Sequence, residues 1–468
     1  MNIIKTSLKS FLFNLLGAGF GFIFQILAAK YLGAEIYGKA NYYLGYCSTI
    51  TIFICFGLQT YIPKIMSKEK DKKKVFSEVI LTYTFLFFAV QLVIFIVLML
   101  NRISIYNYIL ISLLAYFTVL AEIILSYNIS TDNASKGMFY RKFLYSVLNL
   151  LLFSIVFMLS IKQYYVYIYI MIISYIITTI PFLFKNIIKC KINFNIIRVS
   201  FKFYIIQIIY GAYYSYSKVL QKEYGTFETV AVLSISMTIG SLVIMLGDNF
   251  AKISMPEFSK AWEKREMNKL KNIYMTVSRI NCFLVLPIAI GLIVNAQRIL
   301  SLLGKGYIGG EIIFSLVMVS QFANSFTGPN GTLLVMTKYT KLEIYNGIIK
   351  LLVSIIVIVS FGHKVIWAVP LSLVVAEIFV NLLKFIEVKI TLDIVPYKIK
   401  DLLFIIIIAT FQCFVLIYLS KISNVILWIL INGVSVLVFY LLTFRLSPNR
   451  EDKLIINDIK TKIMSFSK

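Results

Sequence analysis

Long apolar stretches recur along this sequence from one end to the other, and they limit what the chain can fold into. A helix that crosses a bilayer needs about 20 mostly apolar residues, and about fourteen stretches meet that length. Within lipid each backbone N–H and C=O must be paired inside its own segment, so these stretches are predicted to be α-helices. They cover roughly residues 9–29, 40–63, 79–100, 106–128, 143–161, 164–184, 203–220, 229–251, 279–297, 308–336, 344–361, 365–387, 402–420 and 425–444.

The composition points to the same class of protein. Hydrophobic residues make up 60% of the chain and charged residues 14%, whereas a soluble domain has about 25% charged residues. A soluble fold has too little interior to bury so much apolar surface, but a bilayer can accept it. We therefore expect an all-α membrane protein of about fourteen transmembrane helices.

The net charge of +25 would indicate nucleic-acid binding in a soluble chain. In a membrane protein, Lys and Arg gather instead on the cytoplasmic side. With the N-terminus placed inside, most basic residues fall on that side, and fourteen helices put both termini in the cytoplasm. The positive net charge is then explained by the basic residues on the cytoplasmic side of the membrane, and no nucleic-acid partner is expected. The inner clusters are 64–74, 185–202, 252–279 and 445–468.

The order of the helices predicts two six-helix bundles followed by two further helices. The expected boundaries are 1–202, 203–400 and 401–468. Segment 252–276 divides the predicted helices near the middle of the chain. Its apolar residues share one helical face, so it is expected to lie on the inner membrane surface or to form a solvated linker helix.

Catalytic chemistry finds little support in the sequence. There is one histidine, His363, and the five cysteines show no metal-ligand spacing. The chain has no Ser/His or Cys/His arrangement, no acid pair and no phosphate loop. We expect a protein that is not an enzyme and that uses no cofactor and no metal.

Five predicted helices each carry one stripe of polar or small residues. Because polar residues are costly in lipid, such stripes should face a cavity or another helix. Five stripes together favour a shared aqueous cavity, as in a transporter. They are Asn14, Gly17, Gly21, Gln25 and Ala28; Ala115, Thr118, Glu122 and Ser126; Gln207, Gly211, Ser215 and Lys218; Ser234, Ser241, Asp248 and Lys252; and Pro370, Glu377, Asn381 and Lys384.

Each stripe also has a purely structural interpretation. Gly17 and Gly21 suit close helix packing. Lys218, Lys252 and Lys384 lie near helix ends, from which a long side chain can reach the interface. Asp248 and Lys252, four residues apart, suit an ion pair. The tenth stretch carries Gly328, Pro329 and Gly331, which predict a kink or a broken helix and a candidate gate.

Three short motifs lie near the ends of predicted helices. The first, residues 28–38 with Lys30, Leu32, Gly33, Glu35, Tyr37 and Gly38, resembles the outer loop after the first helix of the polysaccharide flippase family. Residues 300–307 resemble the stretch after its ninth helix, although Leu303 replaces the usual aromatic residue. Residues 255–259 resemble its Pro-containing stretch after the eighth helix.

This resemblance implies the multidrug/oligosaccharidyl-lipid/polysaccharide exporter superfamily, and within it an O-antigen or capsule repeat-unit translocase. Such proteins move an oligosaccharide on an undecaprenyl pyrophosphate carrier from the inner to the outer leaflet of the bacterial cytoplasmic membrane. The implied mechanism is alternating access with coupling to an ion gradient, H⁺ or Na⁺. Membrane lipid and the polysaccharide polymerase machinery are expected further partners.

An anionic carrier with a polar glycan needs cations for its phosphates and amides for its sugars. Intramembrane carboxylates can bind a cation or change charge, which suits ion coupling. Two alternatives remain: a multidrug efflux antiporter of the same superfamily, and a membrane glycosyltransferase or O-antigen polymerase. The candidate substrate contacts are Lys218, Lys30, Gln25, Gln207, Asn324 and Asn330, and the candidate coupling residues are Glu122, Asp248 and Glu377.

Overall fold

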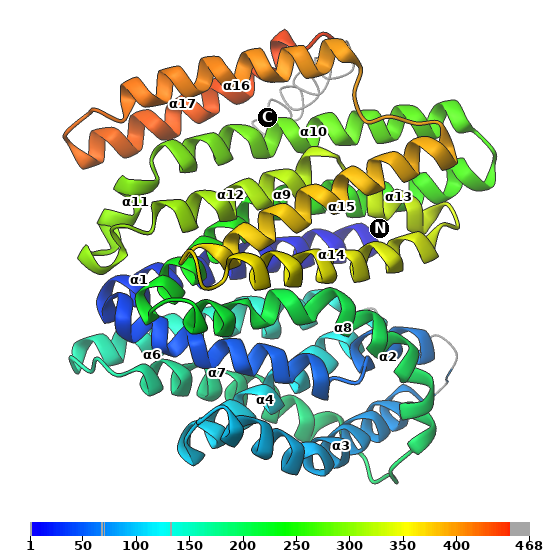
Figure 1. The fold of residues 1–468 in the computed structure, drawn as a ribbon. Coiled ribbons are helices and arrows are strands. Elements are labelled where there is room, and N and C mark those ends of the chain that lie inside the picture. Colours follow the sequence, from blue (N-terminus) through cyan, green and yellow to red (C-terminus); the bar gives the residue numbers. More distant parts are fainter. Residues whose placement is uncertain (1, 67–68, 70, 132, 450–468) are drawn as a thin grey trace. The chain divides into compact units, whose positions relative to one another are not determined.

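Helices form all the regular structure of the described chain, which confirms the predicted all-α class (Figure 1). The computed structural model describes residues 2–66, 69, 71–131 and 133–449. Within these ranges eleven helices are long and apolar enough to cross a membrane, so the chain is a multi-pass membrane protein.

The chain forms two compact units. Unit 1 comprises Met1–Ile235 together with Leu303–Tyr307, and unit 2 comprises Ser236–Leu302 together with Ile308–Lys468. The expected division into two six-helix halves, residues 1–202 and 203–400, and a last part, 401–468, remains a prediction.

Unit 1 is built from the first eight α-helices, the start of a ninth, and two short helices of other types. The helix η1 is a π-helix and η2 is a 3₁₀ helix that belongs to this unit although it lies far along the chain. The elements are α1 (Asn2–Ile54), α2 (Leu58–Met66), α3 (Lys72–Leu100), α4 (Ile105–Ser130), α5 (Ala134–Met138), η1 (Phe139–Leu144), α6 (Tyr145–Met158), α7 (Tyr164–Asn186), α8 (Phe194–Glu223), the first part of α9 (Phe227–Glu263) and η2 (Lys305–Tyr307).

Unit 2 contains the rest of α9 and the eight α-helices that follow. Its last two helices form an antiparallel pair (Figure 1), and the side chain of Gln412 attaches that pair to α10 by donating to the backbone oxygen of Pro287 at 2.8 Å. The helices are α10 (Met267–Val294), α11 (Ala296–Leu303), α12 (Glu311–Phe326), α13 (Asn330–Met336), α14 (Thr340–Phe361), α15 (Ala368–Leu392), α16 (Ile399–Leu419) and α17 (Val425–Leu446).

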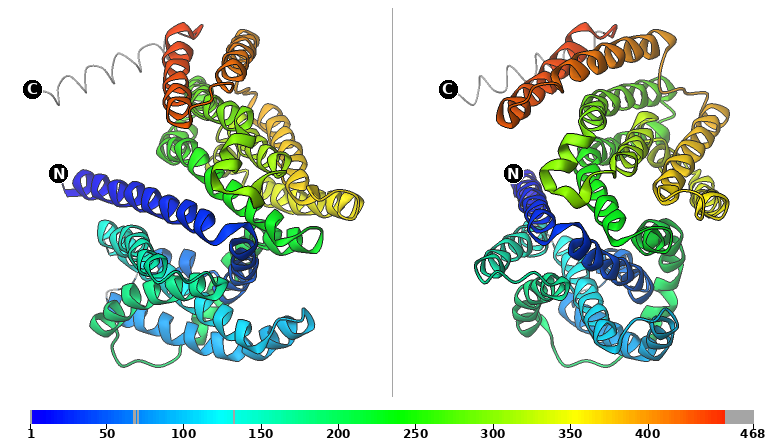
Figure 2. Two further views of the ribbon diagram at one scale, coloured as in Figure 1. Left: turned by 90° about the vertical axis from the view of Figure 1, so that its left-hand side faces the viewer. Right: turned by 60° about the vertical axis from the view of Figure 1, so that its left-hand side comes forward.

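Gly33 divides α1 into two helical parts. Its backbone angles, φ 76° and ψ 166°, are not helical, and glycine reaches positive φ without steric cost. The two parts of α1 consequently run in different directions (Figure 2). The first two predicted stretches, 9–29 and 40–63, both begin within this one helix.

The expected count of fourteen spans is not confirmed. Length and hydropathy identify eleven spanning helices in the described residues, or twelve when the bent helix α8 is counted as one span. With α8 counted, two spans fewer than expected are found, for two reasons. Helix α1 is counted once although it carries two predicted stretches, and the tenth stretch is broken into α12 and α13, each shorter than a span.

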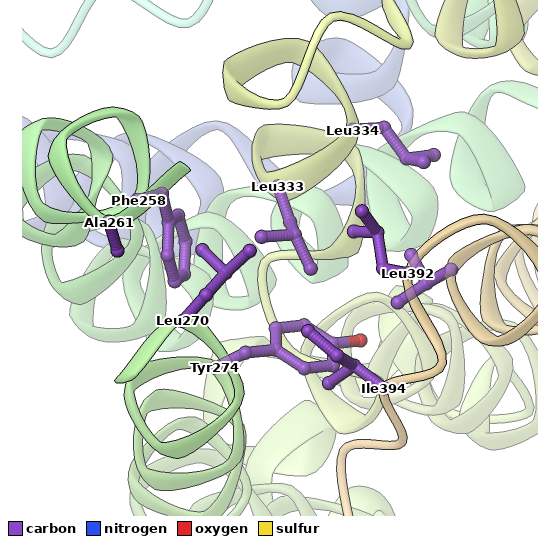
Figure 3. Packing of buried hydrophobic residues seen from close by; sticks show 9 residues of the cluster. Phe258, Ala261, Leu270, Tyr274, Leu333, Leu334, Leu392 and Ile394 are labelled. Carbon is purple, nitrogen blue, oxygen red and sulfur yellow. The ribbon is translucent and has the colours of Figure 1, made fainter. Parts of the chain in front are cut away.

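Segment 252–276 does not form one separate helix, either on the membrane surface or as a solvated linker, contrary to both expectations. It consists of the end of α9, a short turn, and the start of α10. Its apolar face packs inside unit 2, where Phe258, Leu270 and Tyr274 meet residues of α13 and the end of α15 (Figure 3). The segment is amphipathic as predicted, but protein rather than lipid covers its apolar face.

Candidate functional site

Lys218 on α8 is a partly buried cation of unit 1. Its ammonium donates to the side-chain oxygen of Asn41 on α1 at 2.8 Å. Gly45, one turn further along α1, lets α8 approach, because a Cβ there would lie 3.1 Å from the Cβ of Lys218. Among the described residues no carboxylate forms an ion pair with Lys218.

Gln25 lies in a buried hydrogen-bonded group of unit 1. Its side-chain oxygen accepts from the hydroxyls of Tyr37 and Tyr167, both at 2.7 Å. Tyr167 also stacks on Phe24, with ring centroids 5.2 Å apart. The side-chain oxygen of Gln25 is therefore already occupied by two hydroxyl donors.

Two of the three motifs that resemble the flippases meet in unit 1. The hydroxyl of Tyr307 donates to the backbone oxygen of Ala29 at 2.9 Å, and a Cβ on Gly306 would lie 2.9 Å from the Cβ of Ala34. Gly38 approaches the start of α9 so closely that a Cβ would lie 1.8 Å from the backbone oxygen of Phe227. The motif glycines and Tyr307 thus have packing roles, whereas Lys30 is exposed.

Glu122 on α4 forms an ion pair with Arg141 of the π-helix η1. The carboxylate accepts from two guanidinium nitrogens, at 2.9 and 2.6 Å, and the guanidinium also lies over the rings of Tyr145 and Tyr175. A carboxylate held in this way has its charge balanced inside the protein.

Close packing of α1 against η1 and α6 explains the small residues of α1. A Cβ on Gly17 would lie 2.5 Å from the backbone of Lys142, and one on Gly21 would lie 3.3 Å from the hydroxyl of Ser146. These two glycines therefore bring α1 against η1 and α6, as the structural interpretation of their spacing predicts.

Glu377 on α15 forms an ion pair with Lys350 on α14. The same carboxylate accepts from the side-chain amide of Asn381 at 3.0 Å. The oxygen of Asn381 in turn accepts from the hydroxyl of Thr327 at 3.0 Å and from the amide of Asn330 at 3.2 Å. A continuous hydrogen-bonded chain thus joins the Lys350–Glu377 pair to the segment between α12 and α13.

The helix of the tenth stretch is interrupted at residues 327–329, where Gly328 has φ +70°. A Cβ on Gly331 would lie 2.6 Å from the carboxylate of Glu343. Glu343 pairs with Lys384 at 2.6 Å, so this lysine, whose side chain is 14% exposed, does not reach out to the interface as its position near a helix end had suggested.

The remaining candidates show no common site. Gln207 lies half-buried on α8, and its side-chain oxygen has no partner among the described residues. Asn324 is exposed on α12, and Asp248 and Lys252 are exposed on α9. The structure therefore brings together Asn330, Glu377 and the residues of the break in unit 2, while polar contacts in unit 1 do not join Lys218, Gln25 and Glu122.

Four partners could not be predicted from the sequence pattern: Asn41, Arg141, Glu343 and Lys350. Each lies on a different helix from the residue it contacts, and helical periodicity reports only which residues share a face of one helix. The available signal was the presence of opposite charges in neighbouring predicted spans, as in Lys350 and Glu377.

Solved structures share this fold. A structure of the lipid II flippase MurJ in an inward closed conformation matches 95% of this chain and 98% of its own, with a TM-score of 0.75 and 18% identity. An inward-facing multidrug resistance MATE family transporter of the MOP superfamily matches 81% and 94%, with a TM-score of 0.62 and 14% identity. A MOP superfamily transporter from Pyrococcus furiosus matches 84% and 95%, with a TM-score of 0.58 and 14% identity.

No protein-family model matches the sequence, and no curated protein matches it. At identities of 14–18%, the solved structures establish the fold and leave the function open. The chain is a multi-pass membrane protein with the fold that the lipid II flippase MurJ and MATE family transporters share.

Proposed function

We propose that this protein flips undecaprenyl-pyrophosphate-linked oligosaccharide repeat units from the inner to the outer leaflet of a bacterial cytoplasmic membrane, for export of O-antigen or capsular polysaccharide. It works by alternating access and is coupled to an ion gradient, H⁺ or Na⁺. The proposal makes the protein a transporter rather than an enzyme, with the lipid-linked oligosaccharide, membrane lipid and the polysaccharide polymerase machinery as partners.

The main support for this proposal is the way in which charged residues of the helices are paired. Glu122, Glu343 and Glu377 are each paired with a cation, and Asp248 lies one turn before Lys252 on α9. Lys218 contacts the neutral Asn41 instead. A lysine that no described carboxylate neutralises suits an anionic substrate such as a pyrophosphate, whereas carboxylates already paired with cations offer no free charge to a cationic one.

The fold supports a lipid-linked substrate as well. The MurJ structure, described as that of a lipid II flippase, matches almost the whole length of both chains. The motif at 28–38, which resembles the polysaccharide flippases, is well packed: Gly38 sits against α9 and Tyr37 contacts Gln25.

The residues take the following proposed roles. Lys218 binds the pyrophosphate, with Lys30 as an outer anion contact, and the amides of Gln25, Gln207, Asn324 and Asn330 contact sugars. Glu122, Asp248 and Glu377 respond to the coupling ion. Gly328, Pro329 and Gly331 form the hinge of a gate, since they interrupt the helix and the hydrogen-bonded chain through Asn381 reaches the paired Glu377.

A multidrug efflux antiporter is the second candidate, because MATE family transporters share the fold. A cationic drug would be expected to use a carboxylate without a cation partner. Of the four carboxylates considered above, three already hold an ion pair, which favours the flippase.

Reconstitution in proteoliposomes tests the proposal. A lipid-linked oligosaccharide is placed in the inner leaflet, and its arrival outside is followed by cleavage with an added glycosidase. Wild-type protein should move the substrate, and Lys218→Ala should abolish the movement while Lys260→Ala, an exposed lysine on α9, leaves it unchanged. Transport of a cationic dye without any movement of the lipid-linked oligosaccharide would favour the efflux antiporter instead.

A further inference from the structure

Unit 1 contains a cavity of about 470 Å³ between α1, α3 and α8. Its size falls within the range of roughly 300–1,000 Å³ that ligand pockets have. Nine of its fourteen lining residues carry purely hydrocarbon side chains, among them Ile50, Ile54, Val90 and Ile94, and none of the fourteen is charged. The cavity is therefore suited to an apolar guest.

Several polar groups in the lining are already engaged. The hydroxyl of Thr49 donates to the backbone oxygen of Gly45 at 2.9 Å, and the amide of Asn101 donates to that of Val97 at 2.8 Å. The hydroxyls of Tyr46 and Tyr42 lie 3.3 Å apart and share a hydrogen bond. A cavity holding water needs two to four free polar partners for each molecule, and these groups offer few.

Lys218 does not line the cavity but lies close to one end of it, because it packs against Gly45, the neighbour of the lining residue Tyr46. Tyr46 and Tyr216 both line the cavity, and their rings meet edge to face with centroids 6.3 Å apart. Tyr216 is two residues before Lys218 on α8, and Tyr46 is five residues, or about 7.5 Å of helix, after the Asn41 that Lys218 contacts. The apolar cavity and Lys218 thus occupy successive positions along α1 and α8.

We propose that this cavity holds the polyprenyl chain of the carrier next to its pyrophosphate, with Lys218 contacting the phosphates. This inference rests on the proposed function. The occupant follows from charge complementarity: beyond the cavity, along α1 and α8, lies a cation that forms no ion pair with a carboxylate of the described chain. A guest that joins an anion directly to a long hydrocarbon can use both.

Neighbouring residues of α3 provide a matched test. Val93 and Val97 line the cavity, with 62% and 48% of their surfaces exposed, whereas Leu92 and Ile96, with 69% and 49% exposed, do not line it. Val93→Trp with Val97→Trp fills the cavity. Leu92→Trp with Ile96→Trp adds the same bulk at similar exposure on the same helix but outside the cavity, so it controls for folding and insertion.

Binding is measured for purified protein in nanodiscs with undecaprenyl pyrophosphate and with dimethylallyl pyrophosphate, which has the same headgroup on one isoprene unit. The filled variant should bind undecaprenyl pyrophosphate about tenfold more weakly than the control variant, because it loses the burial of the chain. Both variants should bind dimethylallyl pyrophosphate equally, and Lys218→Ala should weaken both ligands.

Equal affinity of the filled and control variants for undecaprenyl pyrophosphate would overturn the proposal. So would equal competition by phosphatidylglycerol, since the cavity would then accept any membrane acyl chain. Leaflet transfer of a lipid-linked oligosaccharide by wild-type protein is measured alongside. If transfer occurs and the two variants bind alike, only the chain-binding cavity fails; if wild-type protein transfers nothing, the proposed function fails.

Discussion

The ammonium of Lys218 donates to the side-chain oxygen of Asn41 across the contact between α8 and α1, at 2.8 Å. An amide satisfies one of the three donors of an ammonium but leaves its charge in place. The lysine is therefore positioned without being neutralised. This arrangement differs from that of Lys350 and Lys384, whose charges are balanced by Glu377 and Glu343.

Asn41→Asp should abolish transport while leaving the fold intact. A carboxylate of nearly the same size would form an ion pair with Lys218 and remove the charge that the pyrophosphate needs. Transport in proteoliposomes and thermal stability would be measured together, with Asn41→Gln as the uncharged control. Normal transport by Asn41→Asp would contradict a role for a free cation at Lys218.

Tyr307→Phe should destabilise unit 1 by about 1–3 kcal/mol, the cost of leaving a buried acceptor without its partner. The residue is fully buried, and its hydroxyl donates to the backbone oxygen of Ala29. Thermal unfolding of the purified protein measures the effect. Tyr418→Phe serves as the control because that side chain is 76% exposed, and equal melting temperatures for the two variants would show that the bond to Ala29 contributes little.

Gly38→Ala should destabilise the protein by about 3 kcal/mol or more, because the added Cβ would overlap the backbone of Phe227 and two helices would have to separate. Gly19→Ala is the matched control. It lies on the same helix, and a Cβ there meets nothing within 4 Å, so better helix propensity should make it neutral or stabilising by up to about 1 kcal/mol. Similar stability of both variants would contradict the close approach at Gly38.

Lys350→Met should destabilise unit 2 by up to about 3 kcal/mol, because it leaves the carboxylate of Glu377 buried without a counter-charge. Adding Glu377→Gln should recover most of that loss, since a neutral amide can keep the bond from Asn381. Denaturation of the single and double variants measures the coupling. If the losses simply add, the pair does not act as a unit.

Much of the fold was predictable because membrane spanning leaves a simple mark in the sequence. Hydropathy located the helices, and the Gly-Pro-Asn-Gly run at 328–331 marked the interruption between α12 and α13. The number of separate helices was harder, because only the backbone angles of Gly33 show that α1 changes direction within one continuous helix.

The site was less predictable than the fold. Periodicity identified Glu122, Glu377 and Lys218, but their partners Arg141, Lys350 and Asn41 come from other helices and depend on how those helices pack. The same limit explains the error at 252–276: an amphipathic pattern specifies an apolar face, and only tertiary contacts show that Leu333 and Leu334 cover it rather than lipid.

The most direct test of the central claim determines in which leaflet lipid-linked oligosaccharide accumulates when cells are depleted of this protein. Access of an outer-surface glycosidase to the accumulated oligosaccharide reports the leaflet. We predict accumulation in the inner leaflet, reversed by the wild-type protein and by Lys260→Ala but not by Lys218→Ala or Asn41→Asp. No accumulation on depletion, together with greater sensitivity to cationic drugs, would contradict the flippase and favour efflux.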